Sequence, residues 1–401
     1  MNYPTIILKP KRSESLKRKH PWVFSGAIDK ILMDEDAEEL REGDLVQVAD
    51  QNEKILGVGH FAEGSIAVRM LSFKKDVVNS NFWERKLTAA FQLRSTLQLT
   101  HSESTTCYRL VHAEGDGLPG LVVDIYGSVA IVQAHSAGFA NALPAIAKAL
   151  KAVMGDKLTA VYSKSEKALH RQGEESIEDD YLLGEAESPQ IVLEHNLQFE
   201  IDWINGQKTG FFIDQRFNRE LLKTYSKGKK VLNTFCYSGG FSVYALAAGA
   251  TEVHSVDSSQ KAIELTDRNV AINFEDCTIH KSFAKDTLKY LNETEELYDT
   301  IILDPPAYAK SKSAQHKAVQ GYKRLNAKAF SMIKKGGILF TFSCSQVVDR
   351  KLFENTIMAA AIEARRNVKV LHHLSQPADH PVSIFHPEGE YLKGLVLYIE
   401  E

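Results

Sequence analysis

The sequence predicts an α/β protein whose C-terminal half forms a parallel, doubly wound sheet. From about residue 191, strand-like runs alternate with helical runs, and this alternation builds right-handed βαβ units with parallel strands. Two of these strands end in a carboxylate, Asp257 and Asp304, at the edge where ligands of open α/β sheets bind. Upstream, several short strand-like runs that end near Phe73 predict a small β-barrel.

The pattern divides the chain into three predicted domains. Residues 1–75 form the barrel, residues 76–190 a central α/β domain, and residues 191–401 the doubly wound domain. A chain of 401 residues is long enough for two or three domains with cores of their own.

The composition, with 44% hydrophobic and 25% charged residues, is that of an ordinary soluble protein. No run of about 18 apolar residues occurs, so we expect no membrane span. The basic N-terminus lacks a following apolar segment and does not predict a secretory signal. Four scattered cysteines without a CxxC pair argue against a zinc site or a disulfide framework, and they favour the cytoplasm. We therefore expect no metal.

The predicted barrel begins with a basic segment. Strands are expected at residues 44–49, 55–61 and 65–71, after an acidic turn over residues 34–44. Trp22 and Phe24 interleave with the charges, and basic residues combined with aromatic ones are typical of a nucleic-acid contact. A merely solvated surface is an equally good interpretation. Residues 1–30 contain these basic residues: Lys9, Lys11, Arg12, Lys17, Arg18, Lys19 and Lys30.

The central domain combines predicted helices over residues 80–97 and 140–154 with strands on either side of a glycine-rich turn at residues 114–120. That turn could also be a phosphate loop, but no helix follows it as such a loop requires. Residues 164–190, rich in Glu, Ser and Asp, predict an exposed excursion or linker.

A glycine turn at Gly239-Gly240 follows the first strand of the doubly wound domain. Such a turn lets backbone N–H groups approach a ligand, and an acid some 20 residues later, here Asp257, can accept from both ribose hydroxyls. The turn has no GxGxxG pattern, which favours S-adenosylmethionine over a dinucleotide. Asp286, after the third strand, is placed to accept from the adenine amino group. Each acid alone could equally be a helix cap or a turn residue.

The run from residue 300 to residue 345 has the strongest chemical signature. One strand ends in Asp304-Pro305-Pro306, and a second ends at Cys344, so both groups should face one crevice. No Asp or Glu occurs between residues 305 and 348. A carboxylate, a thiol and a basic rim indicate covalent chemistry on a nucleic-acid base. The rim consists of these residues: Lys310, Lys312, Lys317, Lys323, Arg324, Lys328, Lys334 and Lys335.

Several motifs resemble the ribosomal RNA large subunit methyltransferase I family. They are KPK (9–11), HPWVFSG (20–26), EGDGLPG (114–120), KTGFFIDQR (208–216), NTFCYSGGF (233–241), DPP (304–306), FSCS (342–345), ADHP (378–381) and YLKG (391–394). The resemblance spans nearly the whole chain. It implies an N-terminal PUA β-barrel, a central α/β domain and a Rossmann-like class I methyltransferase domain. It also implies S-adenosyl-L-methionine as cofactor, methylation of cytosine C5 in 23S rRNA, and a homodimer.

This resemblance assigns the site residues. Cys344 is the expected nucleophile and Asp304 the group that holds the base. Lys208, Asp214, Gln215 and Arg216 are expected at the methionine end of the cofactor. The other expected cofactor-binding residues are Phe235, Tyr237, Ser238, Gly239, Asp257, Ser258, Asp286 and again Asp304. Cys236 is expected to line the same pocket.

The chemistry supports a thiol, because cytosine C5 is too weak a nucleophile until a thiolate adds to C6. The target base has to be unpaired or flipped to reach such a pocket. Many cytosine-C5 RNA methyltransferases carry a second cysteine beside the Asp-Pro-Pro loop, where this chain has Ala307 and Tyr308. Three alternatives stay open: a nitrogen methyltransferase acting on guanine or adenine, a non-catalytic RNA-binding or assembly factor, and, more distantly, an NAD-dependent oxidoreductase.

Overall fold

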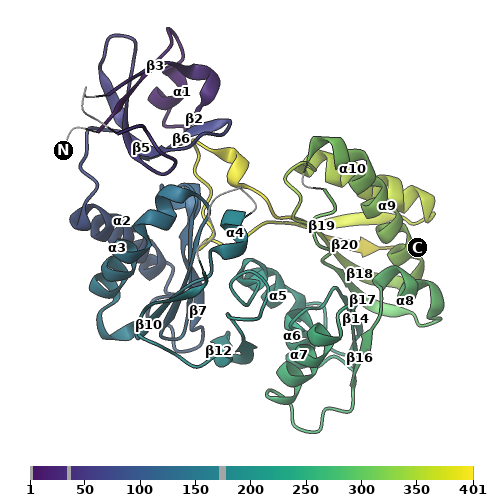
Figure 1. The fold of residues 1–401 in the computed structure, drawn as a ribbon. Coiled ribbons are helices and arrows are strands. Elements are labelled where there is room, and N and C mark those ends of the chain that lie inside the picture. The colour runs from purple at the N-terminus through teal and green to yellow at the C-terminus, as the bar shows by residue number, and fades with distance from the viewer. Residues whose placement is uncertain (1–2, 34–37, 171–177, 310, 401) are drawn as a thin grey trace. The chain divides into compact units, whose positions relative to one another are not determined.

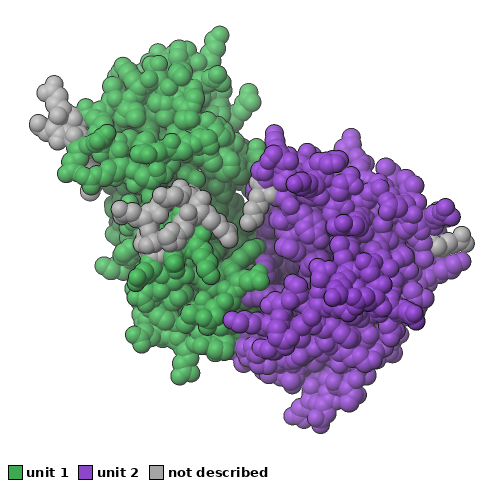
Figure 2. All heavy atoms as spheres, turned by 45° about the vertical axis from the view of Figure 1, so that its right-hand side comes forward, with its two compact units in different colours: residues 1–190, 201–211, 378–389 green, residues 191–200, 212–377, 390–401 purple. Residues whose placement is uncertain are grey.

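The computed structural model describes residues 3–33, 38–170, 178–309 and 311–400. These residues form two compact units, which Figure 2 shows in separate colours. The first unit comprises residues 1–190, 201–211 and 378–389, and the second comprises residues 191–200, 212–377 and 390–401. The predicted acidic turn lies partly outside the described residues, as does Lys310 of the predicted basic rim. The division into three domains at residues 75 and 190 stays a prediction.

The first unit begins with a six-stranded sheet in the order β2-β6-β5-β4-β1-β3. Its interior holds alternate side chains of the strands, such as Ile6, Val48 and Val68, as expected when one face of each strand is buried. The three strands predicted from the sequence are present. The elements are β1 (Thr5–Leu8), α1 (Glu14–Lys17), β2 (Trp22–Phe24), β3 (Ile28–Leu32), β4 (Leu45–Ala49), β5 (Ile55–Phe61) and β6 (Ile66–Ser72).

A five-stranded sheet in the order β11-β10-β9-β8-β7 forms the other part of this unit. Helices α2 and α3 lie side by side against it and bury Phe82, Leu87, Leu143 and Ile146 (Figure 1). The expectation of an exposed excursion over residues 164–190 is wrong in part, because β11 adds a strand to this sheet. Residues 171–177 of that segment lie outside the described residues. The elements are α2 (Ser80–Thr96), β7 (Cys107–His112), β8 (Leu121–Tyr126), β9 (Val129–Ala134), α3 (Ala137–Met154), β10 (Ala160–Ser163), α4 (Glu166–His170) and β11 (Asp180–Leu183).

Two later segments return to the first unit, and buried polar contacts hold the second of them. The fully buried Arg94 donates to both carboxylate oxygens of Asp116 (2.5 and 2.9 Å) and to the backbone oxygen of Asp379 (2.7 Å). The Asp379 carboxylate accepts from the Arg109 N–H at 3.0 Å. A buried charge is tolerable only when it is paired in this way. The chain therefore leaves its C-terminal sheet, anchors to the first unit and returns.

The second unit is a seven-stranded sheet in the order β16-β15-β14-β17-β18-β20-β19. Strands β14 to β18 are parallel, as predicted, whereas β20 runs antiparallel to both of its neighbours. Helices cover both faces (Figure 1). A two-stranded ribbon of β12 (Gln190–Glu194) and β13 (Leu197–Ile201) precedes the sheet.

The strands of this sheet are β14 (Lys230–Thr234), β15 (Glu252–Asp257), β16 (His280–Ala284), β17 (Tyr298–Leu303), β18 (Ile333–Ser343), β19 (Val368–Leu374) and β20 (Lys393–Ile399). The helices are α5 (Arg216–Lys223), α6 (Gly240–Ala247), α7 (Gln260–Ala271), α8 (Thr287–Glu293), α9 (Gln315–Met332) and α10 (Arg350–Glu363). The central strands are buried on both faces, and their sequences are therefore near-continuous apolar runs.

Candidate active site

The loop after β14 has an unusual backbone. Phe235, Tyr237 and Gly239 all have positive φ angles, of 55°, 47° and 72°. Non-glycine residues rarely adopt this region, and such strain clusters at ligand sites. The alternating pattern turns successive backbone groups of the loop in different directions before α6 begins. The strained loop therefore coincides with the predicted cofactor turn.

Gly239 is required there for two reasons. Its φ angle favours glycine, and a Cβ atom at this position would lie 2.7 Å from Thr266 Cγ2. Thr266 is itself fixed, because it is fully buried and its hydroxyl donates to the Tyr237 backbone oxygen at 3.0 Å. Asn269 holds the next residue by donating to the Ser238 backbone oxygen at 2.8 Å. Two side chains of helix α7 thus hold the backbone of the turn in place.

Asp257 ends β15 and faces the same turn. Its carboxylate accepts from the N–H groups of Tyr237 (3.1 Å) and Ser259 (2.9 Å). The side chain is half-buried, and the neighbouring Ser258 is exposed. A carboxylate held by backbone donors and still partly accessible suits recognition of ribose hydroxyls.

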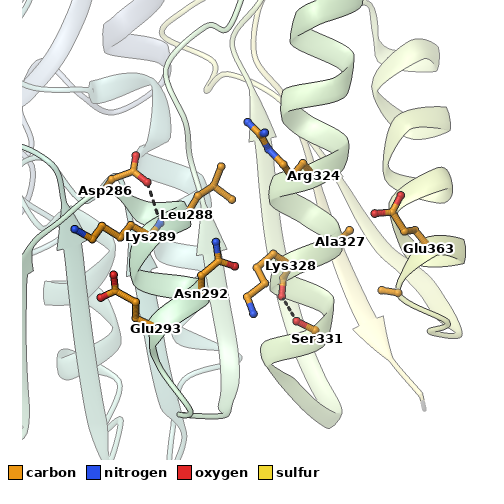
Figure 3. Close-up of a pocket in the computed structure, with 11 residues that line it drawn as sticks. Asp286, Leu288, Lys289, Asn292, Glu293, Arg324, Ala327, Lys328, Ser331 and Glu363 are labelled. Carbon is orange, nitrogen blue, oxygen red and sulfur yellow. Dashed lines mark hydrogen bonds between the residues drawn. The ribbon is translucent and has the colours of Figure 1, made fainter.

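Asp286 follows β16 and caps α8, because its side chain accepts from the Lys289 N–H at 2.9 Å. It also lines a pocket of about 820 Å³ between α8 and α9, which Arg324 and Lys328 of the second helix line as well (Figure 3). The carboxylate lies near Tyr308, whose pKa is raised to about 12, first by burial and then by the charge of Asp286. Recognition of adenine by Asp286 stays a prediction.

Asp304 is positioned through two amide side chains. Gln215 donates from Nε2 to Asp304 Oδ2 at 3.0 Å, and Asn218 donates from Nδ2 to Gln215 Oε1 at 2.6 Å. The second bond fixes which way the Gln215 amide points, so that its donor end faces the carboxylate. Both amides are almost fully buried. Sequence reasoning missed Asn218, which no motif had indicated as a site residue.

Cys344 lies one residue past the end of β18, next to the Asp304 loop. Its Sγ is 4.0 Å from the Pro305 backbone oxygen. The loops are joined further where Ser345 donates to the Ala309 backbone oxygen at 2.7 Å. Since β17 and β18 are parallel neighbours, the thiol and the Asp304 carboxylate lie at the same edge of the sheet.

The four cysteines differ in accessibility. Cys107 and Cys236 are buried, whereas Cys277 and Cys344 are partly exposed. Burial raises the pKa of Cys236 to about 12, so this thiol stays protonated at neutral pH. The structure thus leaves Cys344 as the accessible thiol at the carboxyl edge of the sheet.

The predicted basic rim is not continuous. Lys334 and Lys335 lie at the amino end of β18, the opposite end from Cys344, and Lys334 pairs with Asp299. Lys323 pairs with Glu363 on α10. The prediction of a single rim around the thiol is therefore wrong for Lys334 and Lys335, because helix α9 returns the chain to the amino ends of the strands before β18 begins. For Lys323 it stays a prediction. Lys312 lies just before α9 and Lys317 in its first turn, where Gln315 donates to the backbone oxygen of Val347, three residues after Cys344.

The KTGFFIDQR segment is divided between the units. Lys208 belongs to the first unit, and Asp214, Gln215 and Arg216 belong to the second. Asp214 accepts from the Tyr391 hydroxyl at 2.7 Å, and Arg216 is 1% exposed. Tyr391 was indicated only as part of the YLKG motif. The roles of this segment in cofactor binding stay predictions.

Comparisons with known proteins define the class. Residues 108–385 match the profile of the S-adenosylmethionine-dependent methyltransferases, and residues 6–73 match that of a PUA-like domain. The chain is therefore an S-adenosyl-L-methionine-dependent methyltransferase with a PUA-like domain. None of the helices among the described residues is long and apolar enough to cross a membrane.

Closer relatives define the family. The chain is 38% identical to ribosomal RNA large subunit methyltransferase I of Aeromonas hydrophila, over 98% of both chains. It is also 38% identical to the enzyme of that name from Alteromonas mediterranea, over 99% of both chains. The chain belongs to the ribosomal RNA large subunit methyltransferase I family, which confirms the predicted family, fold class and cofactor.

Solved structures agree in fold. A Streptococcus mutans protein described as a SAM-dependent methyltransferase superposes with a TM-score of 0.83 at 22% identity, covering 99% of this chain and 100% of that one. Another structure, of a methyltransferase complexed with SAH, gives a TM-score of 0.84 at 22% identity over the same shares.

Proposed function

We propose that this enzyme forms 5-methylcytosine in 23S rRNA through a covalent bond between Cys344 and cytosine C6. The observation that carries the proposal is the joining of the Asp304 and Cys344 loops at the ends of two adjacent parallel strands. A nitrogen methyltransferase needs the first of these groups and not the second. An accessible thiol beside the base-binding carboxylate has an obvious use only when the ring has to be activated.

The cofactor residues fit S-adenosyl-L-methionine. The strained turn at residues 235–239 would approach it, Asp257 would accept from its ribose, and Asp286 would accept from its adenine. Gln215 and Asp214 would lie at its methionine end. The bound cofactor supplies an electrophilic methyl group on its sulfonium.

The residues of the chain supply the rest of the chemistry. The Cys344 thiolate adds to C6 of the cytosine, and the electron pair of the C5–C6 double bond moves into the ring. Asp304 accepts from the exocyclic amine and shares a proton with N3, and this proton offsets the negative charge that builds on the ring. The methyl group would then pass to C5. Solvent would take the C5 proton, and the electron pair of the C5–H bond would re-form the C5–C6 double bond and expel the Cys344 thiolate. Tyr308 is no candidate for the base, because its pKa of about 12 keeps it a phenol.

The barrel offers a surface for RNA. Phe24 is 50% exposed and lines a pocket of about 330 Å³ together with Arg12. An exposed ring beside a cation suits stacking on an unpaired base. Trp22, which was predicted to contribute to the same nucleic-acid contact, instead makes contacts within the protein. Its Nε1 donates to Glu114 at 3.0 Å, and its ring packs on His386. We also propose a cytoplasmic homodimer, which light scattering after size exclusion would test.

Replacing Cys344 tests the chemistry. Wild-type enzyme, Cys344→Ala and the control Cys277→Ser are incubated with 23S rRNA from a strain lacking the enzyme, and bisulfite sequencing locates 5-methylcytosine. We expect no product from Cys344→Ala, normal product from Cys277→Ser, and a covalent adduct with 5-fluorocytosine RNA only where Cys344 is present. Full methylation by Cys344→Ala would refute the mechanism. Nitrogen-methylated nucleosides by mass spectrometry would favour the alternative class, and absence of cofactor binding by calorimetry would favour a non-catalytic role.

A further inference from the structure

A buried lysine lies beside the nucleophile loop. Lys393 begins β20 and pairs with Ser343 at the end of β18, one residue before Cys344. The side chain is 3% exposed, and its Nζ donates to the Ser345 backbone oxygen at 2.7 Å. The ammonium is therefore fixed against the carbonyl of the residue that follows the thiol.

This ammonium has little compensation nearby. Among the described residues no salt bridge reaches Lys393, and the neighbouring Glu390 is paired with Arg350 at 2.5 Å. The charged or titratable groups around it are Cys344 just after β18, Glu390, and Asp349 with Arg350 at the start of α10. Burial lowers the pKa of Lys393 to about 8, and Cys344 comes first among the groups that act against this shift. Packing alone would favour an apolar side chain, because a buried cation costs free energy.

We propose that Lys393 is a positioning residue whose positive charge holds Cys344 as the reactive thiolate. This inference rests on the proposed function, in which Cys344 is the nucleophile. The thiol proton passes to water, the electron pair stays on sulfur, and the ammonium keeps its proton and forms no bond to the base. A nearby cation favours the thiolate, which is the attacking species. The ion pair exists above the pH at which the thiol ionises and is lost when Lys393 itself loses its proton.

Alkylation of Cys344 tests this without requiring turnover. The rate of iodoacetamide labelling of the Cys344 peptide is measured by mass spectrometry between pH 5 and pH 10. Three variants are compared with wild type: Lys393→Met, which removes the charge at similar volume; Lys393→Arg, which keeps it; and Lys335→Met, the same change at an exposed position at the far end of β18. Cofactor binding by calorimetry reports that each variant is folded.

For Lys393→Met we expect the labelling midpoint to move up by about one pH unit or more and the rate at neutral pH to fall about tenfold. Methylation kcat should fall with it, and the KM for RNA should stay the same. Lys393→Arg should keep the low midpoint, and Lys335→Met should match wild type. An unchanged labelling profile in Lys393→Met would overturn the inference.

Two outcomes separate this inference from the proposed function. An active Cys344→Ala would refute the proposed function, because Cys344 would not be the nucleophile. An inactive Cys344→Ala together with a wild-type labelling profile in Lys393→Met would refute only the proposed role of Lys393. Should Lys393→Met fail to fold, the wild-type profile decides. A midpoint clearly below about 8.5, the value of an ordinary thiol, supports the ion pair, and a midpoint at or above it overturns the inference.

Discussion

Gly239 provides a quantitative test of how the cofactor turn is built, because the same unit holds a matched control. Gly228 has φ +69°, and a Cβ atom added there would meet open space within 4 Å, whereas Gly239 has φ +72° and Thr266 Cγ2 at 2.7 Å from the same position. A left-handed backbone costs an L-residue about 1–2 kcal/mol, which should be the whole effect of Gly228→Ala. Overpacking against a stiff, buried threonine adds about 1–3 kcal/mol in Gly239→Ala. We therefore expect Gly239→Ala to lower the free energy of unfolding by about 2–5 kcal/mol.

The assay has to report on the second unit alone. All three tryptophans, Trp22, Trp83 and Trp203, belong to the first unit, so hydrogen exchange of peptides from the second unit is followed in urea. Since strain at Gly239 also displaces the proposed cofactor turn, the Kd for S-adenosylmethionine should rise about tenfold or more, which corresponds to about 1.4 kcal/mol. Gly228→Ala should leave it unchanged.

A second substitution separates the clash from the backbone strain. Thr266→Ser removes the colliding Cγ2 and keeps the hydroxyl that donates to the Tyr237 backbone oxygen. In the double variant Gly239→Ala/Thr266→Ser, we expect part of the lost stability to return. Equal losses for Gly239→Ala and Gly228→Ala would refute the reasoning, because the contact with Thr266 would then have no energetic effect.

Three further predictions concern other contacts. Gln215→Met removes the donor to Asp304, a bond to a charged group worth about 1.5–3 kcal/mol, so kcat should fall about 10- to 100-fold; a wild-type kcat would contradict the role of Gln215. Asp116→Ala leaves Arg94 buried without its carboxylate and should destabilise the first unit by about 3–5 kcal/mol in tryptophan-monitored urea unfolding. Glu14→Ala, which breaks the exposed ion pair with Lys17, should have no measurable effect on the stability of this unit. Equal losses of stability in Asp116→Ala and Glu14→Ala would contradict the argument. Burial lowers the pKa of His60 from 6.5 to about 3, so between these values only the unfolded state binds the proton. The first unit should therefore lose about 1.4 kcal/mol of stability per unit fall in pH, and His60→Leu should flatten that slope; an unchanged slope would assign the effect to other groups.

Periodicity predicted most of the fold, because most of its elements follow from local patterns. Apolar strands that alternate with helices predicted the succession of β14 to β18 along the chain. The short strands near the N-terminus predicted the barrel. The antiparallel β20 and the strand β11 were not predicted. β20 pairs with β18, which is distant in the sequence, and β11 lies in a polar segment. In both cases tertiary contacts decide the structure.

The candidate site likewise contains residues that local sequence patterns predict and residues that only tertiary contacts bring together. The position of Asp257, Asp304 and Cys344 at one edge could be predicted because each lies at or directly after the end of a strand, and the carboxyl ends of parallel strands share an edge. Asn218 and Lys393 could not, since their importance comes from what they touch. Asn218 acts by orienting Gln215, and Lys393 reaches the Ser345 carbonyl only because β20 pairs with β18 in one particular register. A shift of that register by one residue would turn Lys393 to the other face of the sheet. The electrostatics of the thiol thus depend on the antiparallel strand, which the alternation of strands and helices along the chain does not encode.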